Sequence, residues 1–316
     1  MLNIVKSEHI MAGVSPALFI IKQLYTLTML KCKVVIGLIL LCFTAVPCFA
    51  DYRFAVIGDT RDGSADGINN KVMQAILDNI KIEGVKFIIV TGDMITGSTR
   101  SNIHGNRLNK WKAIIERYDI PYYISAGNHE IESEDSEDIL RSVFNMPENG
   151  PAGCKELVYS FDYQNSHFIA VDTNLYNNFH NVGGEQLKWL EQDLENNKKN
   201  IIFVFGHEPA YPVSGHIGSS FDRYAAERDR LWGIFKEYKV DIYFCGHEHL
   251  YNRSIHDVVY QIITGGGGAR LDTSEEKLSY YHFILVDVKD EGAIEITVKD
   301  IEGTVRDNFN LNIEGL

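Results

Sequence analysis

Short apolar runs that end in polar clusters recur along the chain from residue 52 onwards. The five clearest runs cover residues 54–57, 87–90, 122–124, 201–205 and 242–244. Because these runs are apolar throughout rather than at every second position, they predict strands that are covered on both faces. Apolar residues at helical spacing predict intervening helices, within residues 72–80, 111–118 and 184–197. The order β-α-β-α-β, then a β-rich middle, then another β-α-β, predicts an α/β fold.

The other segments are predicted from composition and alternation. Residues 280–313 alternate in places and predict closing antiparallel strands. Residues 131–156 are rich in Glu, Asp, Ser, Asn, Gly and Pro, which predicts a surface insertion. The run Gly265–Gly268 is not followed by the Gly-Lys-Ser/Thr of a P-loop, so closely approaching backbone explains it better. Since no repeat or long linker is present, residues 51–316 are predicted to form one domain.

The N-terminal segment has the pattern of a secretory signal peptide. The 13-residue apolar run Val34–Val46 follows Lys31 and Lys33 and precedes Cys48-Phe49-Ala50. These are the charged region, the apolar region and the small-residue cleavage site of such a signal. The run is too short for a membrane-spanning helix, which needs about 20 residues. We therefore predict cleavage after Ala50, an exported protein, and no stable membrane span.

The start of the chain is longer than this signal requires. A signal peptide that begins at Met29 would have an ordinary length. We therefore predict that Met29 is the true start and that residues 1–28 are an extension. Residues 1–50 are set apart from the domain that follows.

Composition indicates a globular protein with an acidic surface. The chain has 316 residues, of which 45% are hydrophobic and 23% charged, enough for one large core or two modest ones. Its formal net charge is −13, from 43 acidic against 30 basic residues. A protein that binds the phosphate backbone of nucleic acid needs a basic face, so nucleic acid is not an expected partner. Phosphate chemistry at a local metal site stays open.

The cysteines do not form a disulfide framework. Three of the five precede the predicted cleavage site, which leaves Cys154 and Cys245 in the mature domain. A single bridge between these two is one possibility. Because Cys245 ends an apolar run that predicts a buried strand, we predict two unpaired thiols instead.

Candidate site residues follow the predicted strands directly. In open α/β sheets the loops after the carboxyl ends of the strands build the site, so these loops are expected to converge. Each residue alone has an ordinary explanation, such as a helix N-cap, a turn or a surface histidine. Such residues at five successive strand ends indicate one common site. The clusters are Gly58-Asp59, Gly92-Asp93, Gly127-Asn128-His129, Gly206-His207 and Gly246-His247-Glu248-His249.

The residue types in these clusters are those of a metal centre. Two carboxylates, an amide oxygen and three imidazoles suit Zn, Mn or Fe better than Ca or Mg alone. His247 and His249 are separated by one residue, so they can point to two different metal ions, and Asp93 can bridge the pair of ions through its two oxygens. Two cations about 3.5–4 Å apart would clamp a phosphoryl group and acidify a water for in-line displacement.

The order and spacing of these motifs resemble those of the calcineurin-like metallophosphoesterases, over most of residues 52–300. Asn128-His129-Glu130 and Tyr251-Asn252-Arg253 resemble the purple acid phosphatase branch of that family. The resemblance implies a layered α/β fold, a β-sandwich of two mixed sheets flanked by helices. It also implies one bimetal centre at the rim of the sandwich.

The resemblance further implies a role for each motif residue. His129 would contact a substrate oxygen or protonate the leaving group, and Asn128 would lie at the substrate as well as at a metal. One metal ion would be held by Asp93, Asn128, His207 and His247, and the other by Asp59, Asp93 and His249.

This sequence departs from the family pattern on the Asp59 side. Most members have Asp-x-His where this chain has Asp59-Thr60-Arg61, and purple enzymes have a metal-binding Tyr where it has Thr96. A guanidinium has no free lone pair, so Arg61 cannot replace the histidine as a ligand. It could pair with Asp59, fork onto a substrate phosphate, or form a surface salt bridge. Without the Tyr ligand, a purple charge-transfer colour is not expected.

One further histidine has a suggestive position. His216 lies nine residues after His207, in a loop with two prolines that could hang over the site. It is a candidate for contact with substrate, and the alternative is an ordinary exposed loop histidine. No role is predicted for the histidines at positions 104, 167, 180, 256 and 282.

These observations predict an exported, metal-dependent phosphoesterase that acts on a small phosphate ester. Monoesters are favoured over diesters, and a water activated by two metal ions (Mn, Fe or Zn) is the expected nucleophile. One alternative is a phosphodiesterase or nucleotidase. Another is a degenerate member that binds without turnover, because Arg61 replaces the usual histidine.

Overall fold

Two six-stranded β-sheets form the centre of the part of the chain that the computed structural model describes, residues 50–272, 277–290 and 292–311. The first sheet has the order β12-β11-β10-β1-β2-β3, and the second has the order β4-β5-β6-β7-β9-β8. Their bounds are β1 (Tyr52–Ile57), β2 (Ile88–Val90), β3 (Tyr122–Ile124), β4 (Tyr159–Tyr163), β5 (Ser166–Ala170), β6 (Ile201–Phe205), β7 (Ile242–Cys245), β8 (Tyr251–His256), β9 (Val259–Thr264), β10 (His282–Val288), β11 (Ile294–Asp300) and β12 (Val305–Leu311). The predicted signal peptide and the predicted start at Met29 lie outside the described residues.

Both sheets are mixed, as the sequence predicted. In the first sheet β1, β2 and β3 are parallel, while β10, β11 and β12 continue the sheet as antiparallel strands. In the second sheet β5, β6, β7 and β9 are parallel, with β4 and β8 antiparallel at the two edges. The predicted closing strands are therefore β10 to β12. Parallel strands place their carboxyl ends at one edge, where the site is found.

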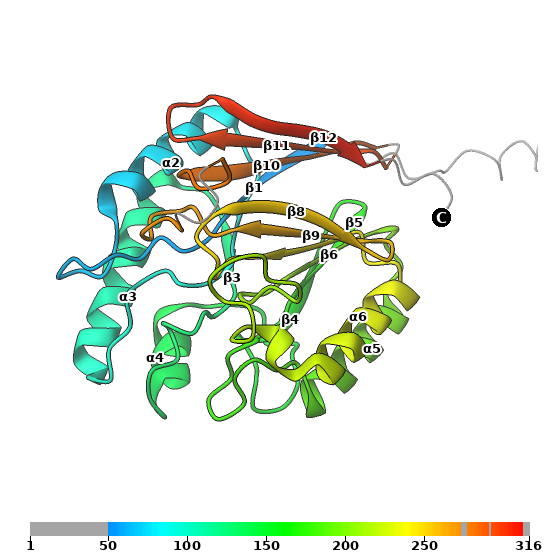
Figure 1. Cartoon of the computed structure of the whole chain (residues 1–316), viewed down its shortest axis with the longest axis horizontal. Helices are drawn as coiled ribbons and strands as arrows, with labels where there is room; N and C mark the ends of the chain where they lie inside the picture. Colours follow the sequence, from blue (N-terminus) through cyan, green and yellow to red (C-terminus); the bar gives the residue numbers. More distant parts are fainter. Residues whose placement is uncertain (1–49, 273–276, 291, 312–316) are drawn as a thin grey trace, which may run out of the picture. The chain divides into compact units, whose positions relative to one another are not determined.

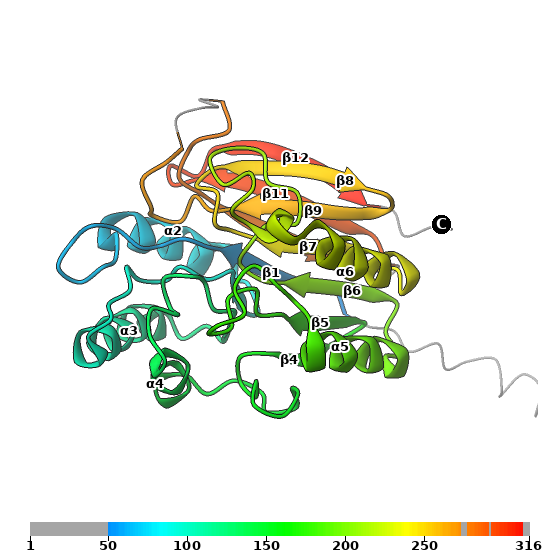
Figure 2. The same ribbon diagram turned by 60° about the horizontal axis from the view of Figure 1, so that its bottom comes forward.

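Aromatic side chains fill the space between the two sheets. Phe54 of β1 lies edge to face against Phe168 of β5 and Phe203 of β6, with ring centroids 5.3 and 5.2 Å apart. All three rings are fully buried. Edge-to-face pairs add about 0.5–1.5 kcal/mol to the free energy gained from burial of apolar area. The layered arrangement is visible in Figures 1 and 2.

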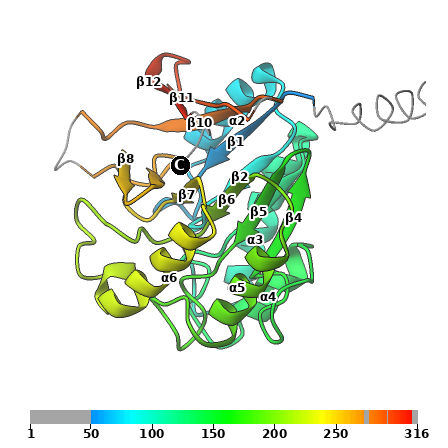
Figure 3. The same cartoon turned by 90° about the vertical axis from the view of Figure 1, so that its right-hand side faces the viewer.

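Helices flank the sandwich, and those at 70–83 and 184–196 agree with the prediction, whereas the predicted 111–118 covers only the end of a helix that begins at Ser101. α5 and α6 lie side by side against the second sheet (Figures 1 and 3). Their Leu190, Trp232 and Phe235 are buried with Val204 and Tyr243 of the strands beneath. The helices are α2 (Asn70–Glu83), α3 (Ser101–Ile115), α4 (Ser136–Val143), α5 (Gly184–Asn196) and α6 (Ala225–Glu237), with short 3-10 turns η1 (Glu116–Tyr118) and η2 (Phe221–Tyr224).

Helix α4 corrects the prediction of a plain surface insertion at residues 131–156. Its Leu140 and Val143 are buried, and the following Phe144 packs against Trp111 of α3 with ring centroids 5.8 Å apart. Two of the acidic residues, Glu137 and Asp138, lie in the first turn of this helix. The polar composition therefore concealed a short amphipathic helix.

Smaller predictions concern the thiols, the glycine run and membrane spans. Cys154 and Cys245 are both free within the described chain, as predicted. A Cβ at Gly265 would collide with the carbonyl of Glu248, and one at Gly267 with the carbonyl of Gly58, so backbone approaches closely at this run. Among the described residues, no helix is both long and apolar enough to cross a membrane.

A buried histidine between two carboxylates lies at the edge of the second sheet. His167 forms hydrogen bonds through Nδ1 with Oδ1 of Asp162, at 2.7 Å, and through Nε2 with Oδ2 of Asp193, at 2.8 Å. Burial acts to lower the pKa of His167, but the hydrogen bonds to Asp193 and Asp162 outweigh it and raise the pKa above its ordinary value. The stabilisation is therefore complete below the unfolded-state pKa of about 6.5 and is lost as pH rises through the folded-state pKa.

We expect His167→Gln to lower the free energy of unfolding by about 1–3 kcal/mol at pH 6, the usual value of hydrogen bonds to charged groups. The loss should be smaller at pH 9, because raising the pH removes positive charge from the wild-type ring. Urea denaturation at the two pH values measures both. His256→Gln is the control, since burial lowers the pKa of His256. An equal loss at the two pH values would contradict the prediction.

Candidate metal centre

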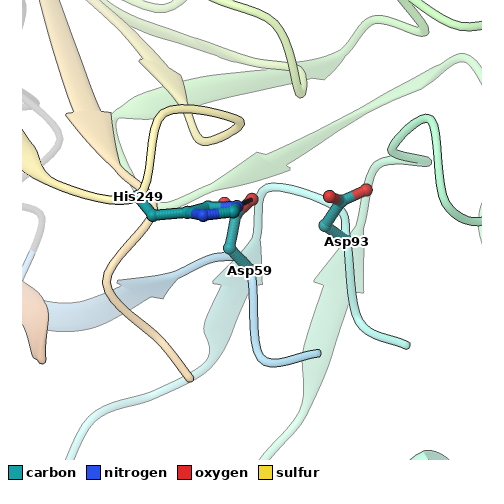
Figure 4. Close-up of side chains that lie close together, drawn as sticks. All are labelled: Asp59, Asp93 and His249. Atoms are coloured by element: carbon teal, nitrogen blue, oxygen red, sulfur yellow. Dashed lines mark ion pairs between the residues drawn. The ribbon is translucent and has the colours of Figure 1, made fainter. Parts of the chain in front are cut away.

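Loops from both sheets meet at the centre. Asp59, Asp93 and Asn128 follow β1, β2 and β3 of the first sheet, while His207 and the pair His247 and His249 follow β6 and β7 of the second. Every predicted strand-end cluster is therefore found in the same region. Figure 4 shows the ring of His249 pointing toward the Asp59 carboxylate, with Asp93 on a separate loop.

Glycine precedes the site residues because the loops approach one another closely. A Cβ at Gly127 would collide with the carboxylate of Asp93, and a Cβ at Gly246 would collide with that of Asp59. The loop after β3 therefore packs directly on Asp93, and the loop after β7 packs on Asp59. Only glycine allows these contacts without displacing a carboxylate.

Three site residues have left-handed backbone conformations. The φ angles are 58° at Asp59, 50° at Asp93 and 70° at His247. Residues other than glycine seldom adopt positive φ, and Asp, Asn and His do so more readily than most. Such strain is typically retained where it aims a functional side chain. Here it turns each side chain sharply out of its strand and into the centre.

The first ligand set converges on the ring of His207. Nε2 of His207 lies 3.1 Å from Oδ1 of Asn128, 3.1 Å from Nδ1 of His247 and 3.4 Å from Oδ1 of Asp93. Nδ1 of His207 donates to the carbonyl of Thr91 at 2.8 Å, which leaves Nε2 with its lone pair facing the cluster. The four residues assigned to one metal ion by the resemblance thus lie together.

The second ligand set is Asp59, Asp93 and His249. One ligand atom of each lies within 4.8 Å of the others. Nδ1 of His249 donates to the carbonyl of Arg270 at 2.8 Å, so Nε2 carries the lone pair, 3.5 Å from Oδ1 of Asp59. Asp59 also accepts the backbone N–H of His247 at 3.1 Å. Both histidines that follow β7 are therefore directed by hydrogen bonds.

The chemistry of these donors fits metal ions. The atoms that face one another are ring nitrogens and carboxylate or amide oxygens, which are lone-pair donors and repel one another without a cation between them. Nε2 of His247 is also buried without a hydrogen-bond partner among the described residues. Outer hydrogen bonds that fix the ring orientation, such as that from His207 to Thr91, are typical of metal-binding histidines.

Arg61 does not pair with Asp59, one of the options that its sequence position left open. Its Nε donates to Oδ2 of Asp93 at 2.9 Å, and its Nη2 lies 3.4 Å from Nε2 of His249. Asp93 is buried, so this pair is not a plain surface salt bridge either. Thr96, at the position of the missing Tyr, donates its hydroxyl to the carbonyl of Asp62.

His129 lies beside the shared carboxylate. Its backbone N–H donates to Oδ1 of Asp93 at 3.1 Å, and its Nε2 is 4.0 Å from Oδ2 of the same residue. In the described part of the chain its Nδ1 has no hydrogen-bond partner, and it lies 3.5 Å from Oε1 of Glu132. Burial lowers the pKa of His129, and the Asp93 carboxylate opposes that effect. The ring is partly exposed and can reach a bound substrate.

His216 lies over the centre, where its loop was expected to hang. Its ring centroid is 4.0 Å from that of His247 and 6.5 Å from that of His249. The loop is held by Glu248, whose carboxylate accepts the N–H groups of Val213 at 2.7 Å and Ser214 at 2.6 Å. Glu248 is fully buried. Glu248, which lies between the two histidines in the sequence, therefore holds the loop that carries His216 in place.

Sequence reasoning quoted Glu130 in a motif and gave it no role. Its carboxylate accepts the backbone N–H groups of Asp93 at 2.8 Å, Gly127 at 2.9 Å and Ile95 at 3.2 Å. Burial, and then the Asp93 carboxylate, raise the pKa of Glu130 to about 8, against the opposing effect of the N–H bonds. Burial likewise acts to raise the pKa of Asp93, but His207, His129 and Arg61 hold it below its usual range. Glu130 thus fixes the loops after β2 and β3 relative to each other.

A layered α/β sandwich with carboxylate, amide and imidazole ligands at its strand ends defines a metallohydrolase of the phosphoesterase type. A family model of calcineurin-like phosphoesterases matches residues 52–251, so the chain belongs to this family. The predicted family and fold are thereby confirmed.

Curated relatives include acid phosphatases. The chain is 27% identical over 232 residues to "Fe(3+)-Zn(2+) purple acid phosphatase 12" of Arabidopsis thaliana, which covers 68% of this chain and 46% of that protein. It is 29% identical over 232 residues to "Phosphoenolpyruvate phosphatase" of Allium cepa, which covers 68% of this chain and 45% of that protein. The matched part thus spans about half the length of these relatives. The name of the Arabidopsis protein implies a binuclear centre in that relative.

Solved structures show the same fold. A purple acid phosphatase from yellow lupin seeds matches with a TM-score of 0.68 and 20% identity, over 83% of this chain and 54% of that one. A dimetal phosphatase from Danio rerio matches with a TM-score of 0.58 and 14% identity, over 83% of this chain and 99% of that one.

Proposed function

We propose that the protein hydrolyses small phosphate esters with a metal centre built from two ligand sets. The observation that carries this proposal is the convergence on Asp93, whose Oδ1 faces His207 and Asn128 while its carboxylate also belongs to the set with Asp59 and His249. Metal ions at such a centre supply Lewis acidity and an acidified water for attack on phosphorus. Mn, Fe and Zn suit these donors.

The residues around the ligand sets have distinct tasks in this proposal. Asn128, whose Oδ1 faces Nε2 of His207 at 3.1 Å, would hold a metal ion through that oxygen and would also lie close to a phosphate oxygen of the substrate. His129, beside Asp93 and partly exposed, donates a proton or hydrogen bond to the leaving-group oxygen. His216 closes the opposite side above His247 and contacts the substrate. Arg61 is the remaining candidate for contact with a phosphate oxygen.

We expect phosphate monoesters to be preferred over diesters. His129, His216 and Arg61 gather hydrogen-bond donors around the centre, which suits the two negative charges of a monoester. The relatives named as a purple acid phosphatase and a phosphoenolpyruvate phosphatase support the same choice. The test compares kcat/KM of metal-loaded protein for p-nitrophenyl phosphate and bis(p-nitrophenyl) phosphate, and we expect about 10-fold or more in favour of the monoester.

Other outcomes of this comparison separate the alternatives. Faster hydrolysis of the diester would favour the phosphodiesterase reading, and a nucleotide panel would then identify a nucleotidase. Metal binding without hydrolysis of either ester would favour a degenerate binding member.

Export is proposed from the sequence of residues 29–50. The short apolar run after two lysines supports a cleaved signal peptide. N-terminal sequencing of the processed protein should begin at Asp51, and an intact N-terminus on cytosolic protein would contradict export.

A further inference from the structure

The guanidinium of Arg61 lies among the ligands of the second set. It donates through Nε to Oδ2 of Asp93 at 2.9 Å, and its Nη2 is 3.4 Å from Nε2 of His249. Because Nδ1 of His249 donates to the carbonyl of Arg270, Nε2 is the lone-pair nitrogen, and the guanidinium faces it as a donor. Arg61 therefore contacts two of the three residues that would hold a second metal ion.

A guanidinium and a metal ion cannot both use the single lone pair of His249 Nε2, which is directed either at an N–H group or at a cation. Oδ2 of Asp93 has two lone pairs, so there the conflict is one of charge and space. The guanidinium also keeps its positive charge under all ordinary conditions, so an ion that entered beside it would be repelled. The first ligand set shares only Asp93 with this conflict, and Oδ1 of Asp93 faces His207 at 3.4 Å while Oδ2 accepts the hydrogen bond from Arg61.

We propose that Arg61 is a built-in competitor for the second metal position. The first set binds one metal ion tightly, and a second ion enters only when the guanidinium leaves Asp93 and His249. This inference rests on the metal centre of the proposed function and goes beyond it, since it concerns how many ions the centre holds. The side chain is about one-fifth exposed, so it has an open direction in which to move.

The test is a metal titration rather than an activity assay. Equilibrium dialysis of chelator-treated full-length protein against Zn²⁺ or Mn²⁺, with metal content measured by plasma mass spectrometry, counts the equivalents bound. Wild-type protein should bind one equivalent tightly and a second far more weakly. Arg61→Ala should bind the second equivalent about 10- to 100-fold more tightly, the usual range for groups that act on metal ligands.

Arg270→Gln is the matched control. This residue is exposed, its backbone carbonyl bonds His249 in either form, and the substitution removes the same charge. The affinity for the second equivalent should stay at the wild-type value in this variant. If Arg270→Gln tightens the second equivalent as much as Arg61→Ala does, general charge is the cause and the proposal is wrong.

The remaining outcomes distinguish this inference from the proposed function. If both proteins bind the first equivalent and Arg61→Ala leaves the second unchanged, the competitor role is wrong while the phosphoesterase proposal stands. Binding of two metal equivalents with equal affinity in wild-type protein would also contradict the competitor role of Arg61. If neither protein binds any metal, the metal centre itself fails.

Discussion

Replacing Asp93 by alanine is expected to reduce phosphate-ester hydrolysis by about 10³-fold or more, or about 4 kcal/mol of transition-state stabilisation. Asp93 belongs to both ligand sets, so its loss should release metal from each. Turnover of a chromogenic phosphate in metal-saturated protein measures the first effect, and bound metal per chain measures the second. Circular dichroism should show that the protein is still folded.

Two further variants complete this test. His207→Ala should reduce turnover comparably, because His207 lies at the centre of the first set. Asp66→Asn is the control, since Asp66 is in the loop after β1 and pairs with Lys110 away from the ligands. Wild-type turnover in metal-loaded Asp93→Ala would eliminate the proposed mechanism.

Glu130→Ala is expected to have the largest effect on stability. The substitution leaves three buried N–H groups without their acceptor, those of Asp93, Gly127 and Ile95. Each such group costs about 1–3 kcal/mol, so the free energy of unfolding should fall by about 3 kcal/mol or more. For a domain of this size the melting temperature should fall by about 6–12 °C. Thermal unfolding followed by circular dichroism gives both values.

The control for this prediction is its neighbour on the same loop. Glu132 is exposed and accepts none of these three backbone N–H groups, so Glu132→Ala should change the free energy of unfolding by under about 1 kcal/mol. A small change in Glu130→Ala, equal to that in the control, would mean that the loops after β2 and β3 hold their positions without this carboxylate.

The parts of the centre that the sequence predicted are those encoded by local pattern. An apolar run followed by Gly-Asp or Gly-His marks the end of a buried strand and its first loop residues. Parallel strands then bring those loops to one edge, whatever the details of packing. This is why Asp59, Asp93 and His207 were correctly predicted to follow buried strands, whereas the two mixed sheets were implied by the family resemblance.

The parts that were missed depend on contacts between distant segments. Arg61 and Asp93 are 32 positions apart, and whether Arg61 pairs with Asp93 or Asp59 is decided by how two loops pack. Glu130 binds backbone N–H groups, which every residue except proline has, so no residue type marks its partners. Helix α4 was missed because its buried Leu140 and Val143 stand in a mostly polar stretch.

The origin of the ligands gives the centre a mechanical role. Asp93 and Asn128 come from the sheet that contains β2 and β3, while His207 and His247 come from the sheet that contains β6 and β7. Aromatic contacts between the sheets are weakly directional, whereas an ion held by all four side chains would be a directional crosslink between the layers. Its binding free energy would add to the free energy that keeps the layers together. Removal of the ion would therefore lower the stability of the contact between the two sheets at this edge.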